Sequence, residues 1–494
     1  MARWELAIAV DRQAGVPLFR QIARAISDDI RRGRLRPGQS LPGTRTLART
    51  LGVQRLTVVA AFDELLAEGW LATQPARGTF VTADLPDPPR PARPAGAIER
   101  PGVPAGFGVD LGAGPPLQMP YDVPGGGLLF APNRPDVRLI PADLIGRAYR
   151  RAIRSGQGVL LSYGRPHGHL RLRVALAGML SATRGLAVAA EDICVTRGSQ
   201  MALSLLARAL VGPGDVVAVE EIGHRPGVEA FRLAGARIVP VPVDRDGLVV
   251  DSLEALAPAG RLRAVYLTPH HQYPTTVTLP AARRLRLLHL ARTHRFAVIE
   301  EDCDHEFHYD GRPVLPLASI DPHGVVAYVG TFSKVLAPGL RIGYVVAPRP
   351  LLARIAAHRL HTDVSGDRVL EYALATLIEE GAIQRHVRRV RREYMARRGV
   401  LVEALGRRLG DALTFDVPAG GLGLWVQAPV ELDIETWAAR ARARGAVIAT
   451  ARAFACDGRP RQFARLGFGS LDREELVEGV RRLAAARPRR GGLA

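Results

Sequence analysis

The chain has 494 residues and a mass of 53.3 kDa, which is too much for one ordinary hydrophobic core and predicts two or three domains. Apolar residues make up 47% of the chain, but no run of about 18 apolar residues occurs, so we expect no membrane span, and the charged N-terminus predicts no secretory signal. The net charge of +19 permits a nucleic-acid partner without requiring one, because residues 1–84, with 12 Arg against 8 Asp and Glu, contribute only +4 of it.

The three cysteines are odd in number, far apart and not spaced like metal ligands. Cys194, Cys303 and Cys456 are therefore expected to be reduced thiols of a cytoplasmic protein. We expect no metal site.

The first elements of the chain predict a helix-turn-helix. Apolar residues recur every four positions from Leu18 to Ile30 and predict a helix over 17–32. Two further helices, over 44–51 and 54–68, are joined by a short glycine-containing turn, which is the pattern of a helix-turn-helix. Apolar segments at 70–73 and 79–81 flank a turn and predict a β-hairpin, so that residues 1–83 form a winged helix-turn-helix domain.

Two stretches of this head resemble the DNA-binding domain of GntR-family transcription regulators. They read Leu41-Pro42-x-x-Arg45-x-Leu47-Ala48-x-x-Leu51-Gly52-Val53-x-Arg55-x-Thr57-Val58, and Leu65-Leu66-Ala67-Glu68-Gly69-Trp70-Leu71 followed by Gly78-Thr79-Phe80-Val81. The resemblance implies that Arg45, Arg55 and Thr57 approach double-stranded DNA. It also implies a wing that approaches DNA through Arg77 and Gly78.

The side-chain chemistry of the head agrees with this, since arginine is the commonest reader of guanine and threonine can contact a phosphate or a base edge. Gly43 and Leu56 depart from the family, which often has Ser at the first position and Asn or Thr at the second. Fewer phosphate contacts are expected as a result.

Residues 84–124 are expected to be a linker, because seven prolines between residues 84 and 106 favour an extended, semi-rigid chain. Beyond it, short apolar strands alternate with helical stretches, which predicts an α/β domain over residues 125–370 on a mostly parallel seven-stranded sheet. The predicted strands are 193–196, 216–220, 237–241, 264–268, 296–300, 325–329 and 341–346.

Residues 371–494 contain long arginine-rich helices and fewer strands, and predict a smaller α+β domain. A dense run of arginines extends from Arg385 to Arg398. It can either follow a DNA backbone or form the solvated face of a helix, and we favour the second interpretation.

Lys334 is the only lysine among the 67 basic residues. Arginine supplies positive charge and anion binding as well as lysine does, but it cannot lose its proton and attack a carbonyl, since its pKa stays above about 12. A single retained lysine therefore indicates amine chemistry, most simply a Schiff base. By composition alone, Lys334 could equally be a solvated surface residue. The neighbouring residues are needed to distinguish this interpretation from a reactive amine.

The surroundings of Lys334 match the needs of pyridoxal phosphate, which requires a lysine, a carboxylate at its pyridine nitrogen, phosphate donors and a flat group on its ring. The turn 196–200 follows a strand and opens a helix, where glycine and backbone amides form an anion site. Acidic residues cluster after the strand 296–300. Further donors follow at Thr331, Ser333 and Arg341.

These segments resemble the fold-type I aminotransferase domain of MocR-type regulators, a GntR subfamily that joins the winged helix to such a domain. The matching stretches are Tyr163-Gly164-x-Pro166-x-Gly168, Thr196-Arg197-Gly198-Ser199-Gln200, Thr268-Pro269-His270-His271-Gln272-Tyr273-Pro274-Thr275, Ile299–Tyr309 and residues 330–344.

The resemblance implies that Lys334 forms the aldimine with pyridoxal 5′-phosphate. It implies a cofactor site made of Lys334, Glu301, Gly198, Ser199, Gln200, His224, Tyr273, Thr331, Ser333 and Arg341. The carboxylate of a bound amino acid would be held by Arg465, with Arg452 as the second choice.

Three residues of this site depart from the family. Glu301 stands in for the aspartate that pairs the pyridine nitrogen, Cys303 replaces a tyrosine that would hydrogen-bond the ring oxygen, and His224 replaces a tyrosine that stacks on the ring. Asp302 does not restore the aspartate, because neighbouring strand residues face opposite ways. The changes together predict weaker or electronically altered cofactor binding.

The sequence thus leads to a homodimeric DNA-binding transcription regulator that holds pyridoxal phosphate and senses an amine or amino acid. The alternative is a working pyridoxal-phosphate-dependent aminotransferase with an accessory DNA-binding head, for which Glu301 and Cys303 predict slow turnover. A third hypothesis is a regulator that no longer binds the cofactor.

Overall fold

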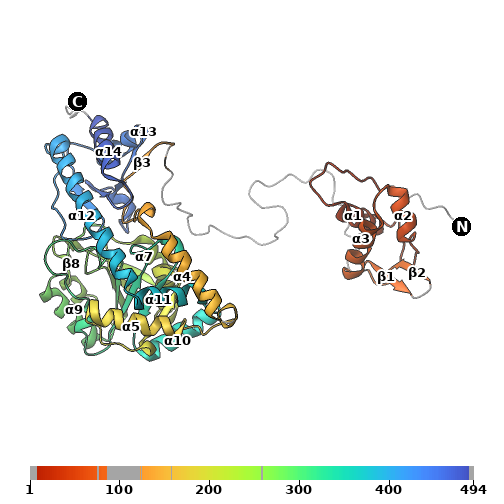
Figure 1. The fold of residues 1–494 in the computed structure, drawn as a ribbon, viewed down its shortest axis with the longest axis horizontal. Coiled ribbons are helices and arrows are strands. Elements are labelled where there is room, and N and C mark those ends of the chain that lie inside the picture. Colours follow the sequence, from red (N-terminus) through yellow and green to blue (C-terminus); the bar gives the residue numbers. More distant parts are fainter. Residues whose placement is uncertain are drawn as a thin grey trace. The chain divides into compact units, whose positions relative to one another are not determined.

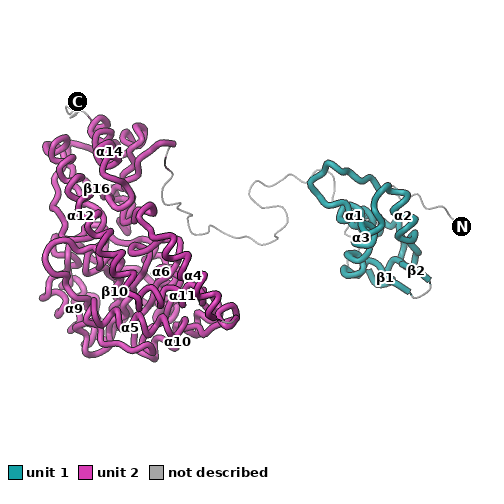
Figure 2. The backbone as a smooth tube through the Cα atoms, viewed as in Figure 1, with its two compact units in different colours: residues 1–117 teal, residues 118–494 magenta. Residues whose placement is uncertain are grey.

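The computed structural model describes residues 8–74, 77–85, 123, 125–156, 158–257 and 260–488. Its contacts divide the chain into two compact units, residues 1–117 and 118–494 (Figure 2). The prolines of the predicted linker lie outside the described residues, and the predicted four-part division at residues 84, 125 and 371 stays a prediction. No helix among the described residues is long and apolar enough to cross a membrane.

The first unit is a winged helix-turn-helix. Ile22 and Ile26 of α1 are fully buried in one hydrophobic core with Val58 and Leu65 of α3. Gly52 ends α2 in the left-handed conformation (φ 63°), the usual way to stop a helix sharply. Each predicted helix is present to within one residue. The elements are α1 (Leu18–Arg31), α2 (Thr44–Leu51), α3 (Arg55–Ala67) and the antiparallel pair β1 (Leu71–Gln74) and β2 (Gly78–Val81).

The second unit is built on a seven-stranded sheet with the strand order β4-β12-β11-β10-β9-β5-β6. All neighbours are parallel except β12, which runs antiparallel to both β11 and β4. All seven predicted strands are present. They are β4 (Ile193–Thr196), β5 (Val216–Glu220), β6 (Arg237–Val241), β9 (Leu262–Leu267), β10 (Ala297–Asp302), β11 (Val326–Thr331) and β12 (Gly343–Val346).

Four of the seven predicted strands have ends that differ from the prediction by one or two residues, and two of these differences concern site residues. Strand β10 continues to Asp302, so Glu301 and Asp302 lie within the strand and not beyond it. Arg341 lies before β12 in a left-handed conformation (φ 51°), because the turn Pro338–Leu340 has to reverse the chain there.

Helices cover both faces of this sheet (Figure 1). Helices α6, α7 and α10 share a core with one face, which includes Val217 and Ile299. Helices α4, α5 and α11 cover part of the other face, and α9 the rest. The helices are α4 (Ala142–Ser155), α5 (Leu170–Arg184), α6 (Gly198–Leu210), α7 (Arg225–Leu233), α8 (Asp251–Glu254), α9 (Ala281–His294), α10 (Arg349–Leu360) and α11 (Arg368–Glu379), with a small hairpin of β7 (Val243–Asp244) and β8 (Gly247–Leu248).

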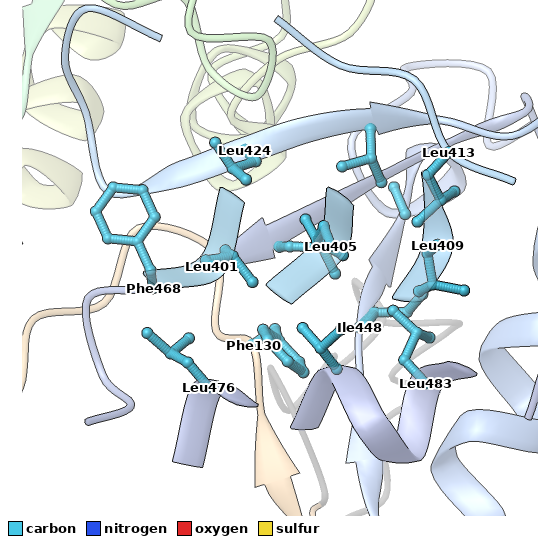
Figure 3. Close-up of a cluster of buried hydrophobic side chains, with 14 of the residues drawn as sticks. Phe130, Leu401, Leu405, Leu409, Leu413, Leu424, Ile448, Phe468, Leu476 and Leu483 are labelled. Atoms are coloured by element: carbon cyan, nitrogen blue, oxygen red, sulfur yellow. The ribbon is translucent and has the colours of Figure 1, made fainter. Parts of the chain in front are cut away.

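The C-terminal part has a core of its own, in which Phe130 lies among Leu401, Leu405 and Leu483 (Figure 3). Phe130 follows β3 (Leu128–Leu129), which pairs with β14, so this early segment packs with the C-terminal residues. The order of the small sheet is β13-β16-β15. The elements are α12 (Ala382–Leu409), β13 (Gly423–Gln427), α13 (Ile434–Ala443), β14 (Ala446–Val447), β15 (Ala449–Thr450), β16 (Phe463–Gly467) and α14 (Arg473–Ala485).

The run of arginines lies on α12, and five of its seven members are exposed. The other two, Arg397 and Arg398, are buried. Arg397 Nη2 lies 2.9 Å from an Asp136 carboxylate oxygen, and Arg398 Nη1 lies 2.6 Å from one of Asp310. Part of the run therefore holds α12 to earlier segments of the chain.

Leu405, which is fully buried, tests the packing of the C-terminal core. We expect Leu405→Ala to lower the free energy of unfolding of the second unit by about 2–5 kcal/mol, because the substitution leaves a cavity. Leu285→Ala on α9, where the side chain is 60% exposed, is the matched control and should change it by less than about 0.5 kcal/mol. Urea unfolding followed by circular dichroism measures both, and equal losses would contradict the packing.

Candidate functional site

A cavity of about 270 Å³ lies at the carboxyl ends of the parallel strands, where sheets of this kind bind ligands. Of the ten residues predicted for a cofactor site, nine line it: Ser199, Gln200, His224, Tyr273, Glu301, Thr331, Ser333, Lys334 and Arg341. The tenth, Gly198, packs closely against Arg341, since a Cβ at position 198 would be 2.6 Å from the Arg341 guanidinium.

Lys334 lies half-buried in the turn after β11. Burial lowers the pKa of its amine, and the neighbouring Cys303, Asp304 and Glu301 offset this only in part. A lowered pKa increases the fraction of neutral amine near neutral pH, and the neutral amine is the nucleophile.

Glu301 is a buried carboxylate that stays ionised. Burial by itself would raise its pKa, but His224 and hydrogen bonds from His224, Tyr266 and Cys303 outweigh it and bring the pKa down to about 2. His224 Nδ1 lies 3.3 Å from one carboxylate oxygen and Cys303 Sγ 3.1 Å from the other. The Tyr266 hydroxyl donates to the same oxygen that His224 approaches. A fixed negative charge therefore faces the cavity.

The carboxylates on either side of Glu301 have their hydrogen bonds elsewhere, although Asp302 also lines the cavity. Asp302 accepts a hydrogen bond from the Tyr328 hydroxyl (2.8 Å), and its carboxylate lies 3.3 Å from His305 Nδ1. Glu300 accepts the backbone N–H groups of residues 317 and 318. This is the alternation of a strand, and it leaves Glu301 as the carboxylate of β10 that the cavity side chains surround.

The turn from β4 into α6 has the features of an anion site. Gly198, with φ 77°, begins the helix, whose first N–H groups have no partners within the helix. Arg341 Nη2 donates to the Arg197 carbonyl oxygen at 3.1 Å, which keeps the guanidinium at this corner. The Gln200 side chain instead donates to the Pro226 carbonyl oxygen at 2.7 Å, so that it is the backbone of Gln200 that remains for an anion.

The two arginines predicted for a carboxylate differ in burial. Arg465 on β16 is buried, donates to the Pro274 carbonyl oxygen, and has its guanidinium carbon 5.1 Å from the centre of the Tyr273 ring, which lines the cavity. Arg452 is exposed. Among the described residues that line the cavity itself, neither arginine occurs.

The residues predicted to approach DNA lie at the starts of elements in the first unit. Arg45 and Arg55 are exposed near the N-terminal ends of α2 and α3, and Thr57 is half-buried. Arg77 and Gly78 are exposed at the start of β2, where Gly78 has φ 106°. Leu56, one of the departures from the family pattern, is 75% exposed between Arg55 and Thr57.

Several residues at or beside the cavity were not predicted as site residues, and three of them show why. Tyr266 holds Glu301 from β9, and only the register of β9 against β10 shows this. Thr268 accepts the backbone N–H of Tyr273 (2.9 Å) and donates to Glu220 (2.9 Å), which fixes the cavity wall. Asn133 reaches the cavity from a segment far away in sequence, for which no local pattern gives a signal.

Comparison with known proteins agrees with both units. The family model of aminotransferase class I and II matches residues 140–483, and that of bacterial regulatory proteins of the gntR family matches residues 18–81. The chain is 34% identical to the probable rhizopine catabolism regulatory protein MocR of Rhizobium meliloti, over 97% of this chain and 95% of that protein. It is 32% identical to the HTH-type transcriptional regulator TauR of Rhodobacter capsulatus, over 95% and 96% respectively.

Among solved structures, LysN, the alpha-aminoadipate aminotransferase of Thermus thermophilus in complex with N-(5′-phosphopyridoxyl)-L-leucine, matches with a TM-score of 0.68. The two are 30% identical, and the match covers 73% of this chain and 92% of LysN. The second unit therefore has the fold-type I aminotransferase architecture. With a GntR head before this body, and similarity to MocR and TauR along almost its whole length, the chain belongs to the MocR-type subfamily of GntR regulators.

Proposed function

We propose that the protein is a cytoplasmic, homodimeric transcription regulator that binds DNA through its head and holds pyridoxal phosphate covalently through Lys334. In this proposal it responds to an amine or an amino acid. One observation carries the proposal: the only lysine of the chain lies in a cavity that also presents an ionised carboxylate, Glu301, and an anion-binding helix N-terminus.

The donor set of the cavity fits pyridoxal phosphate. When bound, this cofactor supplies an aldehyde that reacts with amines and a ring that withdraws electrons. Glu301 offers the countercharge for a protonated pyridine nitrogen, and the α6 N-terminus offers N–H groups for the phosphate, with Arg341 adding its charge. Gly198 is required at this corner, because a side chain there would collide with the Arg341 guanidinium.

An amino-acid effector would place its amine near Lys334 and its carboxylate near Arg465. Arg465 is preferred to Arg452 because it is buried and packs on Tyr273, a cavity residue. Such a ligand would shift the protein toward the arrangement of β16 and the cavity to which the ligand binds more tightly. In a two-fold dimer, two heads would then meet two DNA half-sites.

The alternative of a working aminotransferase is supported by the ionised Glu301 and by the similarity to LysN. Cys303 opposes it, because burial raises the pKa of its thiol well above the ordinary value and a neutral thiol is a weak hydrogen-bond donor. Repeated release of keto acid from amino acids, abolished by Lys334→Ala, would establish the enzyme instead of the sensor.

Covalent binding of pyridoxal phosphate to Lys334 can be measured directly by mass spectrometry. Pyridoxal phosphate followed by borohydride should leave one adduct per chain on the peptide that contains Lys334. Lys334→Arg, which keeps the charge but has no reactive amine, should carry none. Peptide mass spectrometry measures both proteins. An unmodified wild-type peptide would overturn covalent binding.

The role of Arg465 can be separated from general damage by a pair of ligands that differ only in the carboxylate. L-Leucine and 3-methylbutylamine should both shift the absorption spectrum of the cofactor-loaded protein. In Arg465→Gln the apparent Kd of leucine should rise by about ten-fold or more, as expected for a lost charged hydrogen bond, and that of the amine should not change. Arg452→Gln is the control. A similar loss for both ligands would argue against a carboxylate contact.

Contact of the head with DNA is tested by salt dependence. Arg55→Ala should weaken binding to a labelled duplex and reduce the slope of log Kd against log salt by about 0.9 if one phosphate contact is lost. Arg388→Ala, an exposed member of the arginine run on α12, should leave the slope unchanged. Fluorescence anisotropy measures the slopes, and the opposite ranking would assign the DNA contact to α12.

A further inference from the structure

Four of the chain's 13 histidines gather beside the cavity. His270 and His271 follow β9, and His305 and His308 follow the neighbouring strand β10. The ring centres of His270 and His271 are 4.1 Å apart, and those of His270 and His305 are 4.4 Å apart. The carboxyl ends of two adjacent strands therefore bring these imidazoles together.

Two of the ring nitrogens already have the spacing of metal ligands. His271 Nε2 and His308 Nδ1 are 3.4 Å apart. Two nitrogens bound to one tetrahedral zinc ion at about 2.0–2.1 Å lie about 3.3 Å apart. One nitrogen of His270 completes a group whose three ligand atoms all lie within 4.8 Å of one another. A small rotation of the His270 side chain would close the group.

His270 supplies an independent reason to expect a ligand. The residue is only 2% exposed, and neither of its buried ring nitrogens has a hydrogen-bond partner among the described residues. A buried polar group without a partner costs about 1–3 kcal/mol of stability, so native proteins rarely keep one without compensation. A metal ion would give this ring its missing contact.

One neighbour of the cluster orients the His271 ring, and another packs closely against it. The Asp304 carboxylate lies 2.9 Å from His271 Nδ1, which leaves Nε2 to face His308, as in the carboxylate–histidine–metal arrangement of many sites. Gly420, which bridges to His308, packs so closely against His271 that a Cβ there would collide with Nε2. His305 has its Nδ1 3.3 Å from an Asp302 carboxylate oxygen, and its buried ring nitrogens, like those of His270, have no hydrogen-bond partner among the described residues, but it is not a member of the group of three.

We propose that His270, His271 and His308 bind one divalent transition-metal ion, with Zn²⁺ as the best match. Imidazole nitrogens suit Zn²⁺, Cu²⁺ and Ni²⁺, and three of them leave a fourth position open on zinc. His270 and His271 line the cavity, so the ion would lie at the cavity wall. The site would join the loop after β9 to the segment after β10, and it does not depend on the cofactor or on Lys334. It departs from the expectation, drawn from cysteine spacing, that the protein has no metal site.

Metal binding is tested with tag-free, full-length protein that has been stripped with a chelator. After addition of Zn²⁺ and dialysis, elemental analysis should find one zinc ion per chain. Titration against a chromophoric chelator should give His308→Asn and His271→Asn at least ten-fold weaker affinity. His289→Asn, an exposed histidine on α9, should bind like the wild type. Co²⁺ in place of Zn²⁺ should give the intense visible bands of a tetrahedral site in the wild type and lose them in His308→Asn.

Circular dichroism establishes that each variant is folded, and the half-buried His308 carries the test if His271→Asn unfolds. Lys334→Arg should bind zinc like the wild type, which separates this site from the cofactor proposal. Substoichiometric zinc in the wild type, or equal affinity of His308→Asn and His289→Asn, would overturn the proposal.

Discussion

The cavity depends on one carboxylate that is both buried and charged. An isolated carboxyl group loses much of its hydration on burial and responds by keeping its proton. Glu301 avoids this because a phenol, an imidazole and a thiol all meet it from different strands and loops. Glu300, one residue earlier, lacks such help: burial raises its pKa to about 7, and two backbone N–H groups offset this only in part. The contrast shows that the surroundings, and not the residue type, set the charge at the end of β10.

Much of the fold could be predicted from the sequence, because its signals are local. Helix periodicity predicts the three helices of the head. Seven apolar segments of the body predict every strand of the large sheet. The sequence predicts the ends of elements less well. Glu301 and Asp302 belong to β10 because its pairing with β11 continues through both residues. No pattern in the sequence indicates that Phe130 packs with Leu401, since this contact joins segments about 270 residues apart.

The site residues that belong to sequence motifs could be predicted. Those that tertiary packing brings to the site could not. Lys334 and the turn 196–200 could be found from local motifs, a weak one in the case of the turn, and both contribute residues to one cavity. Tyr266, Asn133 and the unpartnered His270 gain their meaning only from neighbours that are distant in sequence. The contact of His224 Nδ1 with Glu301 was not predicted either, because it joins the loop after β5 to β10, and the expected stacking of His224 on a ring stays a prediction. Contacts between side chains of different strands cannot be predicted from the sequence of one strand alone.

The path of the chain into the second unit has a mechanical consequence. The first strand after the predicted linker, β3, pairs with β14, and Phe130 packs in the same core as Leu466 of β16. Leu466 follows Arg465 directly in the chain. The segment that leads to the head is thus fastened to the part of the body that carries the buried arginine, and not to the large sheet that carries Lys334. A displacement of β16 relative to that sheet would therefore act first on β3 and Phe130, through the core that they share.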